Sequence, residues 1–163
     1  TDVVKRTRGQ RPELRITEDL EYWAYLATFG KWGFIPEILF VSDGSAVTKQ
    51  RGWIEKNKKR WESAPTIEDW EKRIISRLGS PLPEGYLKAR GRIAANLTYS
   101  MILSFRDKIA RQTVLTYKHN FPTNKLTILL KVAATSVPVW YLVCLLLRLK
   151  EYSRGICISA LRS

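Results

Sequence analysis

Histidine and cysteine, which supply many catalytic groups and metal ligands, are almost absent from this sequence. His119 is the single histidine, and Cys144 and Cys157 are the two cysteines. These three residues cannot form a four-ligand zinc site of the usual spacing. The chain also lacks a P-loop, a G-x-S-x-G nucleophile turn and an H-E-x-x-H zinc helix. We therefore expect no enzymatic activity, no metal site and no cofactor.

Acidic residues are scarce in the second half of the chain. Residues 85–163 contain 13 basic side chains and only two acidic ones, Asp107 and Glu151, whereas residues 1–84 contain 15 basic and 13 acidic ones. The formal net charge is +13, yet 45% of the residues are hydrophobic, too many for a disordered polycation. A surface that only has to stay soluble normally mixes its charges. The imbalance predicts a folded protein whose second half binds a polyanion.

The first 16 residues combine positive charge with helix-breaking residues. Gly9 and Pro12 would interrupt a helix there, and the segment has no apolar periodicity. We therefore predict an extended basic N-terminal arm, residues 1–16, and a single helical domain, residues 17–163. No apolar stretch follows the first charges, so we expect no secretory signal peptide in the sequence as it stands. Thr1 also fits removal of an initiator Met, which would make this a cytoplasmic product.

The first part of the predicted domain contains two expected helices with a loop between them. A helix is expected within residues 17–30, with Thr17 as its N-cap and Gly30 as its stop. Leu20, Trp23 and Ala27 would lie on one face of this helix. Residues 31–45 predict a packed loop with a short strand at 38–41. Residues 45–62 predict a basic helix whose tryptophans are more typical of core anchors than of base-stacking groups.

The clearest local signal predicts a helix over residues 67–78. Thr66 and Asp69 resemble a capping box, and Gly79 is a natural stop before two prolines. The acidic residues Glu68, Asp69 and Glu71 could be imagined as a metal-dependent nuclease site. Their place in the first turn explains them through the helix dipole, so we do not assign them a catalytic role.

One long helix is expected over residues 85–117. At 100° per residue, Lys88, Arg92 and Arg106 fall on the face opposite to its apolar stripe, so one face would pack and the other would be cationic. The stripe repeats every fourth residue and consists of Ile93, Leu97, Met101, Phe105 and Ile109.

The most apolar stretch is KLTILLKVAATSVPVWYLVCLLLRLKE, residues 125–151. Its length is close to that of a membrane span, but Lys131 and Pro138 interrupt it and basic residues flank both ends. A helix buried between the subunits of an oligomer requires no explanation for Lys131, so the sequence favours that reading. A membrane span over residues 126–147 and contact with a lipid envelope are the alternatives.

These patterns predict an all-α protein of several short helices followed by two long C-terminal helices. Without catalytic equipment or a base-reading motif, a cationic and oligomer-prone protein is suited to packaging nucleic acid through its phosphates. The side chains expected to bind the nucleic acid lie on the arm, on the tryptophan helix and on the first long helix. They are Lys5, Arg6, Arg8, Arg11, Arg15, Lys56, Lys58, Lys59, Arg60, Lys88, Arg90, Arg92, Arg106, Lys108 and Arg111.

The order of elements carries a resemblance to a known family. A basic arm and short helices precede GSPLPEGYLKARGRIAANL, residues 79–97, which leads into a long helix. This arrangement resembles the major capsid proteins of filamentous DNA viruses of archaea. The resemblance implies helical subunits that form interlocked oligomers, wrap double-stranded DNA in A-form and reside in the virion, sometimes beneath a lipid envelope.

Two other functions fit the composition. One is a subunit of a large ribonucleoprotein, such as a divergent organellar ribosomal protein, and the other is a single-span subunit of a membrane complex. Salt-sensitive nucleic-acid binding would separate the packaging and ribonucleoprotein functions from the membrane one, because neutralised phosphates release counterions.

Overall fold

The computed structural model describes the backbone of residues 2–7, 9–30 and 53–160, and the side chains of these residues except 53–56 and 154–160. All regular structure in these ranges is helical, so the predicted all-α class is confirmed for them. The strand expected at 38–41 and the start of the helix expected at 45–62 lie outside the described residues. In chain order the helices are α1 (Asp2–Arg6), α2 (Glu18–Ala27), α3 (Trp53–Glu62), α4 (Ile67–Leu78), α5 (Glu84–Leu103), α6 (Asp107–Tyr117), α7 (Lys125–Ala133) and α8 (Val137–Ala160).

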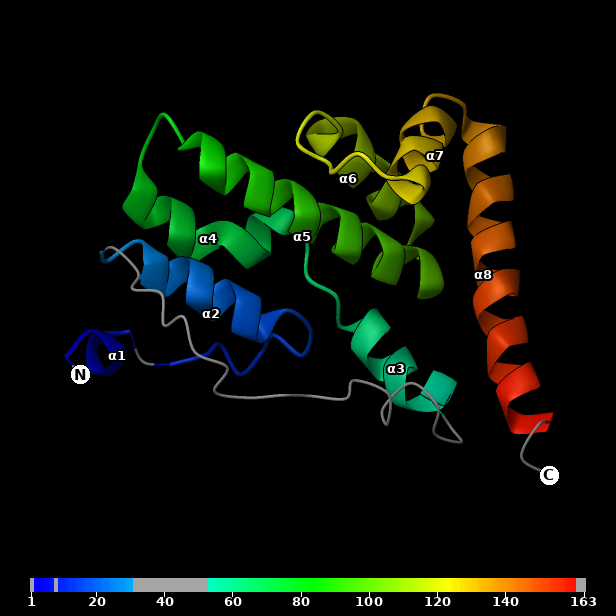
Figure 1. The fold of residues 1–163 in the computed structure, drawn as a ribbon, viewed down its shortest axis with the longest axis horizontal. Coiled ribbons are helices and arrows are strands. Elements are labelled where there is room, and N and C mark those ends of the chain that lie inside the picture. The colour runs from blue at the N-terminus through cyan, green and yellow to red at the C-terminus, as the bar shows by residue number, and fades with distance from the viewer. Residues whose placement is uncertain (1, 8, 31–52, 161–163) are drawn as a thin grey trace, which may run out of the picture.

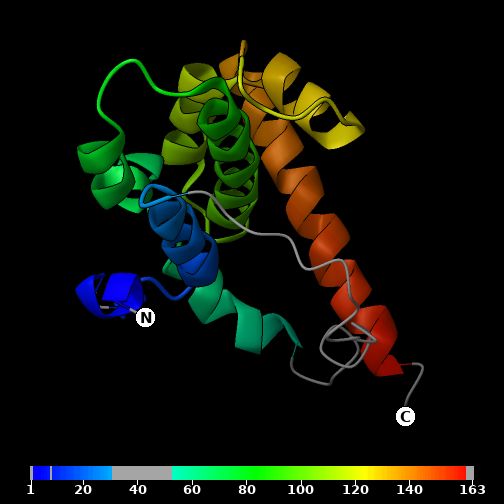
Figure 2. The same cartoon turned by 60° about the vertical axis from the view of Figure 1, so that its left-hand side comes forward.

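Helix α5 is the central element of the fold (Figure 1). It packs against α3, α4, α6 and α8, and α7 contacts both α6 and α8. Helix α2 packs on α4 near one end of α5, whereas α8 stands steeply across the other end (Figures 1 and 2). One edge of α5, which we call its free edge, carries the exposed side chains of Lys88, Arg92 and Asn96.

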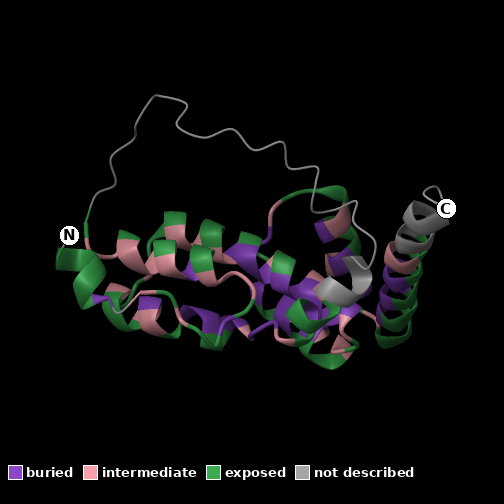
Figure 3. Cartoon of the chain, turned by 90° about the horizontal axis from the view of Figure 1, so that it is seen from below, coloured by how far each residue is buried: buried purple, intermediate pink, exposed green. Residues whose placement is uncertain are grey.

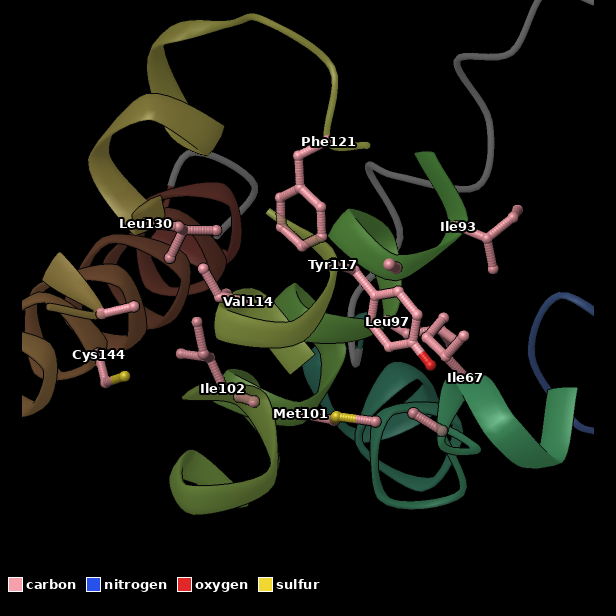
Figure 4. Close-up of a cluster of buried hydrophobic side chains, with 14 of the residues drawn as sticks. Ile67, Ile93, Leu97, Met101, Ile102, Val114, Tyr117, Phe121, Leu130 and Cys144 are labelled. Carbon is pink, nitrogen blue, oxygen red and sulfur yellow. The ribbon is translucent and has the colours of Figure 1, made fainter. Parts of the chain in front are cut away.

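The hydrophobic core lies where the later helices meet around α5 (Figure 4). Leu97 and Met101 of α5, Val114 of α6 and Leu130 of α7 are fully buried there. Cys144 of α8 is buried in the same core, and burial raises the pKa of its thiol to about 12. This thiol is therefore protonated at neutral pH.

The N-terminal arm packs on the helical domain instead of extending away from it. Leu14 is buried in the core, and the hydroxyl groups of Thr7 and Tyr22 lie 3.0 Å apart in a hydrogen bond. Arg73 of α4 donates to the carbonyl oxygen of Gly9 at 3.1 Å. The prediction of an extended arm is wrong for the described residues, because apolar burial and these bonds offset the entropy lost on ordering.

Helix α4 has the bounds that the sequence predicts, Ile67–Leu78. The Thr66 hydroxyl accepts a 3.2 Å hydrogen bond from the backbone amide of Asp69. Gly79 follows the last turn with φ 67°, a conformation that glycine adopts without steric cost. The predicted N-terminal cap and glycine stop are therefore confirmed.

Helix α2 uses a different face from the one the sequence predicts. Thr17 has φ 61° and its side chain makes no capping hydrogen bond. Leu20 and Trp23, on the expected apolar face, are 38% and 56% exposed. The fully buried position is Glu21, whose carboxylate accepts two 2.6 Å hydrogen bonds from Arg73. A charged pair thus takes the place of an apolar contact between α2 and α4.

The long helix expected over residues 85–117 is divided into α5 and α6. The chain turns at residues 104–106, where Phe105 has φ 61°. The turn folds α6 back onto α5, so Ile93 remains buried whereas Phe105 and Ile109 are 66% and 41% exposed. The predicted apolar stripe therefore continues only to Met101, and residues of α6 such as Val114 complete the core in its place.

The apolar stretch of residues 125–151 is likewise divided into α7 and α8. Asn124 caps α7 through the backbone amide of Thr127 at 3.0 Å, and a short turn at residues 134–136 follows. Pro138 lies in the first turn of α8, where its missing amide hydrogen leaves no bond unmade. None of the helices in the described part of the chain combines the length and the apolar character that crossing a membrane requires.

Gly91 lies where α5 passes closest to the loop after α6. A Cβ atom at this position would lie 1.7 Å from the carbonyl oxygen of Asn120. We expect Gly91→Ala to lower the free energy of unfolding by about 2 kcal/mol or more, because the loop backbone has to move. Urea denaturation would measure this loss.

Gly85→Ala in the same helix is the matched control, because no atom lies within 4 Å of the added Cβ. It should leave stability unchanged or raise it by up to about 1 kcal/mol through helix propensity. Equal effects of the two substitutions would contradict the close approach at Gly91.

Candidate nucleic-acid interface

Three open hollows meet along the free edge of α5, and Arg92 lines all of them. One, of about 530 Å³, extends toward α2 and includes Leu20. The second, of about 500 Å³, includes His119 on the loop after α6. The third, of about 580 Å³, reaches the beginning of α7 at Leu126. Together they form a shallow surface depression, which we call the α5 hollow.

Polar side chains follow one another along the floor of the α5 hollow. Lys88, Arg92 and Asn96 are exposed and lie four residues apart, so they project from successive turns of α5 on one side. Glu84 is the nearest acid, at 2.7 Å from the Lys88 ammonium group. Both partners of that pair are more than 70% exposed, so water and salt screen it and leave the lysine able to bind another anion.

The candidate residues of the arm and of α3 differ in how exposed their side chains are. Lys5, Arg6 and Arg15 are exposed, as are Lys58, Lys59 and Arg60 on α3. Arg8 and the side chain of Lys56 lie outside the described residues. Arg11 is not on the open surface, because its guanidinium donates to the backbone carbonyl of Asp69 at 2.6 Å and pairs with Glu13.

The candidates of α5 and α6 fall into an exposed and an internal group. Lys88, Arg92 and Lys108 are exposed. Arg106 donates to the carbonyl oxygen of Ala64, and Arg111 donates to that of Ala134 at 2.9 Å. The expected cationic face of Lys88, Arg92 and Arg106 therefore does not form. The break at residues 104–106 removes Arg106 from the helix that carries the other two.

Arg90 is the third internal arginine and lies between α4 and α6. One of its nitrogen atoms lies 3.5 Å from the Glu71 carboxylate, and its guanidinium lies 5.0 Å from the centre of the Tyr117 ring. Its side chain is 15% exposed. Arg90 was predicted to bind phosphate, but its position between packed helices gives it a structural role.

The acids that could be imagined as a nuclease site are engaged in the same packing. Tyr86 donates to Glu71 at 2.8 Å, Tyr117 donates to Glu68 at 2.8 Å, and Asp69 pairs with an arginine of the N-terminal segment. Within the described ranges, no cluster of three histidine, cysteine or acidic side chains is arranged to hold a metal ion. The position of these acids serves helix packing.

The pKa values of the Glu71 and Glu68 carboxyl groups are shifted in opposite directions. Burial raises the pKa of the Glu71 carboxyl, and the bond from Tyr86 and the charge of Arg90 offset only part of that effect. Burial also acts on Glu68, but hydrogen bonds from the backbone and from Tyr117 hold the pKa of that carboxyl below its usual value. Burial and these bonds raise the pKa values of Tyr86 and Tyr117, so both remain donors at neutral pH.

Asn96 and His119 are two of the polar residues that line the α5 hollow and were not among the sequence-based candidates. Asn96 follows Arg92 by four residues, so helical spacing from Lys88 would have placed it on the same side. His119 reaches the hollow from a loop, and no local pattern in the sequence connects it with α5.

Comparison of the chain with known protein families, with curated proteins and with solved structures found no match.

The raised pKa of Glu71 predicts a pH-dependent contribution to stability. A carboxyl that binds its proton more tightly in the folded state stabilises the fold when protonated, and this contribution is lost as the pH rises through the folded-state pKa. We expect Glu71→Gln, which cannot ionise, to become progressively more stable relative to the unaltered protein as the pH rises above 4.5, the usual pKa of the group. Urea denaturation across a pH series would measure the difference.

The exposed Glu62 provides a control, and Glu62→Gln should stay within about 0.5 kcal/mol of the unaltered protein throughout the series. A constant or shrinking difference for Glu71→Gln would contradict the proposed burial of an ionised carboxylate.

Proposed function

We propose that this protein packages nucleic acid as a structural coat subunit, binding double-stranded DNA through backbone phosphates. The observation that supports this most directly is the pair of exposed cations, Lys88 and Arg92, on one side of α5 in a hollow without a buried acid. Lysine and arginine on one helix edge bind a phosphate chain by charge and carry little sequence information. Such binding suits a protein that covers a whole genome.

The neighbouring groups suit a phosphate ligand rather than a reacting substrate. Asn96 and His119 supply hydrogen bonds beside the two cations, and both face open solvent. An enzyme site would be expected to hold a nucleophile beside an oriented base, and the α5 hollow contains no such pair. Exposed Lys5, Arg6 and Lys108 would extend the phosphate contacts beyond the hollow.

The charge of the whole molecule supports the same proposal. Most of the +13 net charge comes from residues 85–163, and several arginines there are bonded internally. An exterior that remains cationic after these bonds are counted would attract a polyanion at long range and repel other copies until phosphate neutralises it. We propose that the assembly on DNA is a virion coat made of many copies.

The phosphate role of the α5 hollow can be measured from the salt dependence of DNA binding. The double substitution Lys88→Gln and Arg92→Gln should reduce the slope of log K against log salt by roughly 2, about one for each lost phosphate contact. Fluorescence anisotropy with a labelled DNA duplex would give both slopes.

Lys72→Gln with Lys150→Gln removes the same charge from exposed sites on α4 and α8, and serves as the matched control. Its slope should stay closer to that of the unaltered protein. If both pairs reduce the slope equally, binding depends on net charge alone and the α5 hollow is not the interface.

Packaging also requires protection, which simple binding does not. When the protein is added in excess over a DNA duplex, we expect the DNA to resist nuclease digestion over its whole length, because coat subunits leave no free backbone. A parallel reaction with double-stranded RNA would show whether the preference is for DNA. Binding without protection would argue against a coat and favour a ribonucleoprotein or other non-packaging role.

A further inference from the structure

Helix α8 is apolar on two sides, and only one of them is covered. Trp140, Cys144 and Leu147 are buried against the core. The opposite side, which we call the outer face of α8, points away from the other helices (Figure 3). Its large apolar side chains are between 43% and 57% exposed, and they are Val139, Tyr141, Leu142, Leu145, Leu146 and Leu149.

The outer face carries no charge from residue 137 to residue 149. The one charged side chain between residues 137 and 149 is that of Arg148, which turns inward to donate to the carbonyl oxygen of Ile102 and to pair with Asp107. Helix α7, which packs against α8, adds Ile128, Leu129 and Val132, each at least 44% exposed. A helix that is apolar on every side is normally buried on every side.

We propose that the outer face of α8 docks against the same face of a second copy of this chain. The size is suitable: six half-exposed side chains leave on the order of 500 Å², and those of α7 bring the surface to roughly 800 Å², which is what one partner contributes to a stable interface. An isolated soluble subunit rarely exposes a continuous apolar area of this size.

The spacing on α8 fits pairing with another helix. Leu142, Leu145 and Leu149 are separated by three and four residues, which is the repeat of a helix-pairing seam. Tyr141 and Leu146 flank this seam on either side, where two-helix coils usually carry charges. The apolar surface is therefore wider than one seam, and the α7 helices of the two copies would cover its margins.

The distribution of charge over the surface favours a second copy of this chain as the partner of the outer face. Each copy carries a net charge of +13, so most of its surface repels another copy, whereas the outer face of α8 is neutral. A two-fold arrangement lets each copy cover the face of the other, and the contact closes without leaving an apolar edge. A membrane-surface helix would instead present a polar, basic side opposite its apolar one, and that side of α8 is buried in the core.

The interface deepens the proposed coat function by naming the contact between subunits, but it can be tested without nucleic acid. Nuclease-treated protein in about 0.5 M salt, where surface charges are screened, would be studied by light scattering coupled to size exclusion. We expect a dimer for the unaltered protein and a dissociation constant at least thirtyfold weaker for Leu145→Asp, because the aspartate would be buried at the centre of the contact. Circular dichroism would verify that the helices remain.

Val4→Asp on α1 introduces the same charge at a comparably exposed valine, and it should leave the dimer intact. Leu149 is 57% exposed, so Leu149→Asp is a second disrupting variant in case Leu145→Asp fails to fold. Mixing Leu145→Asp with Leu145→Lys should restore a mixed dimer, because opposite charges would then face one another across the contact.

A monomeric unaltered protein would overturn the proposal, and so would a Leu145→Asp variant that dimerises as strongly as the unaltered chain. Binding of a monomer to neutral phosphatidylcholine vesicles would assign the outer face to lipid instead. DNA binding by a monomer would leave the proposed phosphate contacts standing while removing this interface.

Discussion

Arginine side chains donate hydrogen bonds to several backbone carbonyl groups at or just beyond the ends of helices. Arg111 donates to the carbonyl oxygen of Ala134, the residue directly after α7, and Arg148 donates to that of Ile102 in the last turn of α5. Buried carbonyl groups left without a donor cost free energy, and guanidinium groups can reach them while keeping their charge. These bonds connect α6 with the end of α7 and α8 with the end of α5, and so add to the apolar packing among the four helices.

This use of arginine decides which part of the positive charge faces outward. Arg90 between α4 and α6 stabilises helix packing, whereas Lys88 and Arg92, two residues on either side of it, project into the α5 hollow. The difference follows from helix geometry, because a shift of two residues rotates a side chain by about 200°. A single helix therefore contributes both to the core and to the proposed phosphate contacts.

Local signals in the sequence predicted the local structure well. The cap at Thr66, the stop at Gly79 and the limits of α4 follow from side-chain chemistry within a few residues, and so does the all-helical class. The break at Phe105 could not be predicted in this way, since the periodic apolar stripe continues through it. The turn exists because α6 packs back on α5, and that gain depends on residues distant in the sequence. The same limit applies to the candidate site, where a surface arginine and one that reaches a distant carbonyl look identical in the sequence.

The lysines and arginines of the described chain differ in one further respect. The described lysine side chains are exposed or half-buried, and only Lys131 reaches a backbone carbonyl, whereas several arginines hold helices together. Acetylation reacts with amines and leaves guanidinium groups intact. Enzymatic or chemical acetylation would therefore remove much of the outer charge and preserve the arginine bonds of the scaffold, giving a reversible means of releasing a bound polyanion from a protein that stays folded.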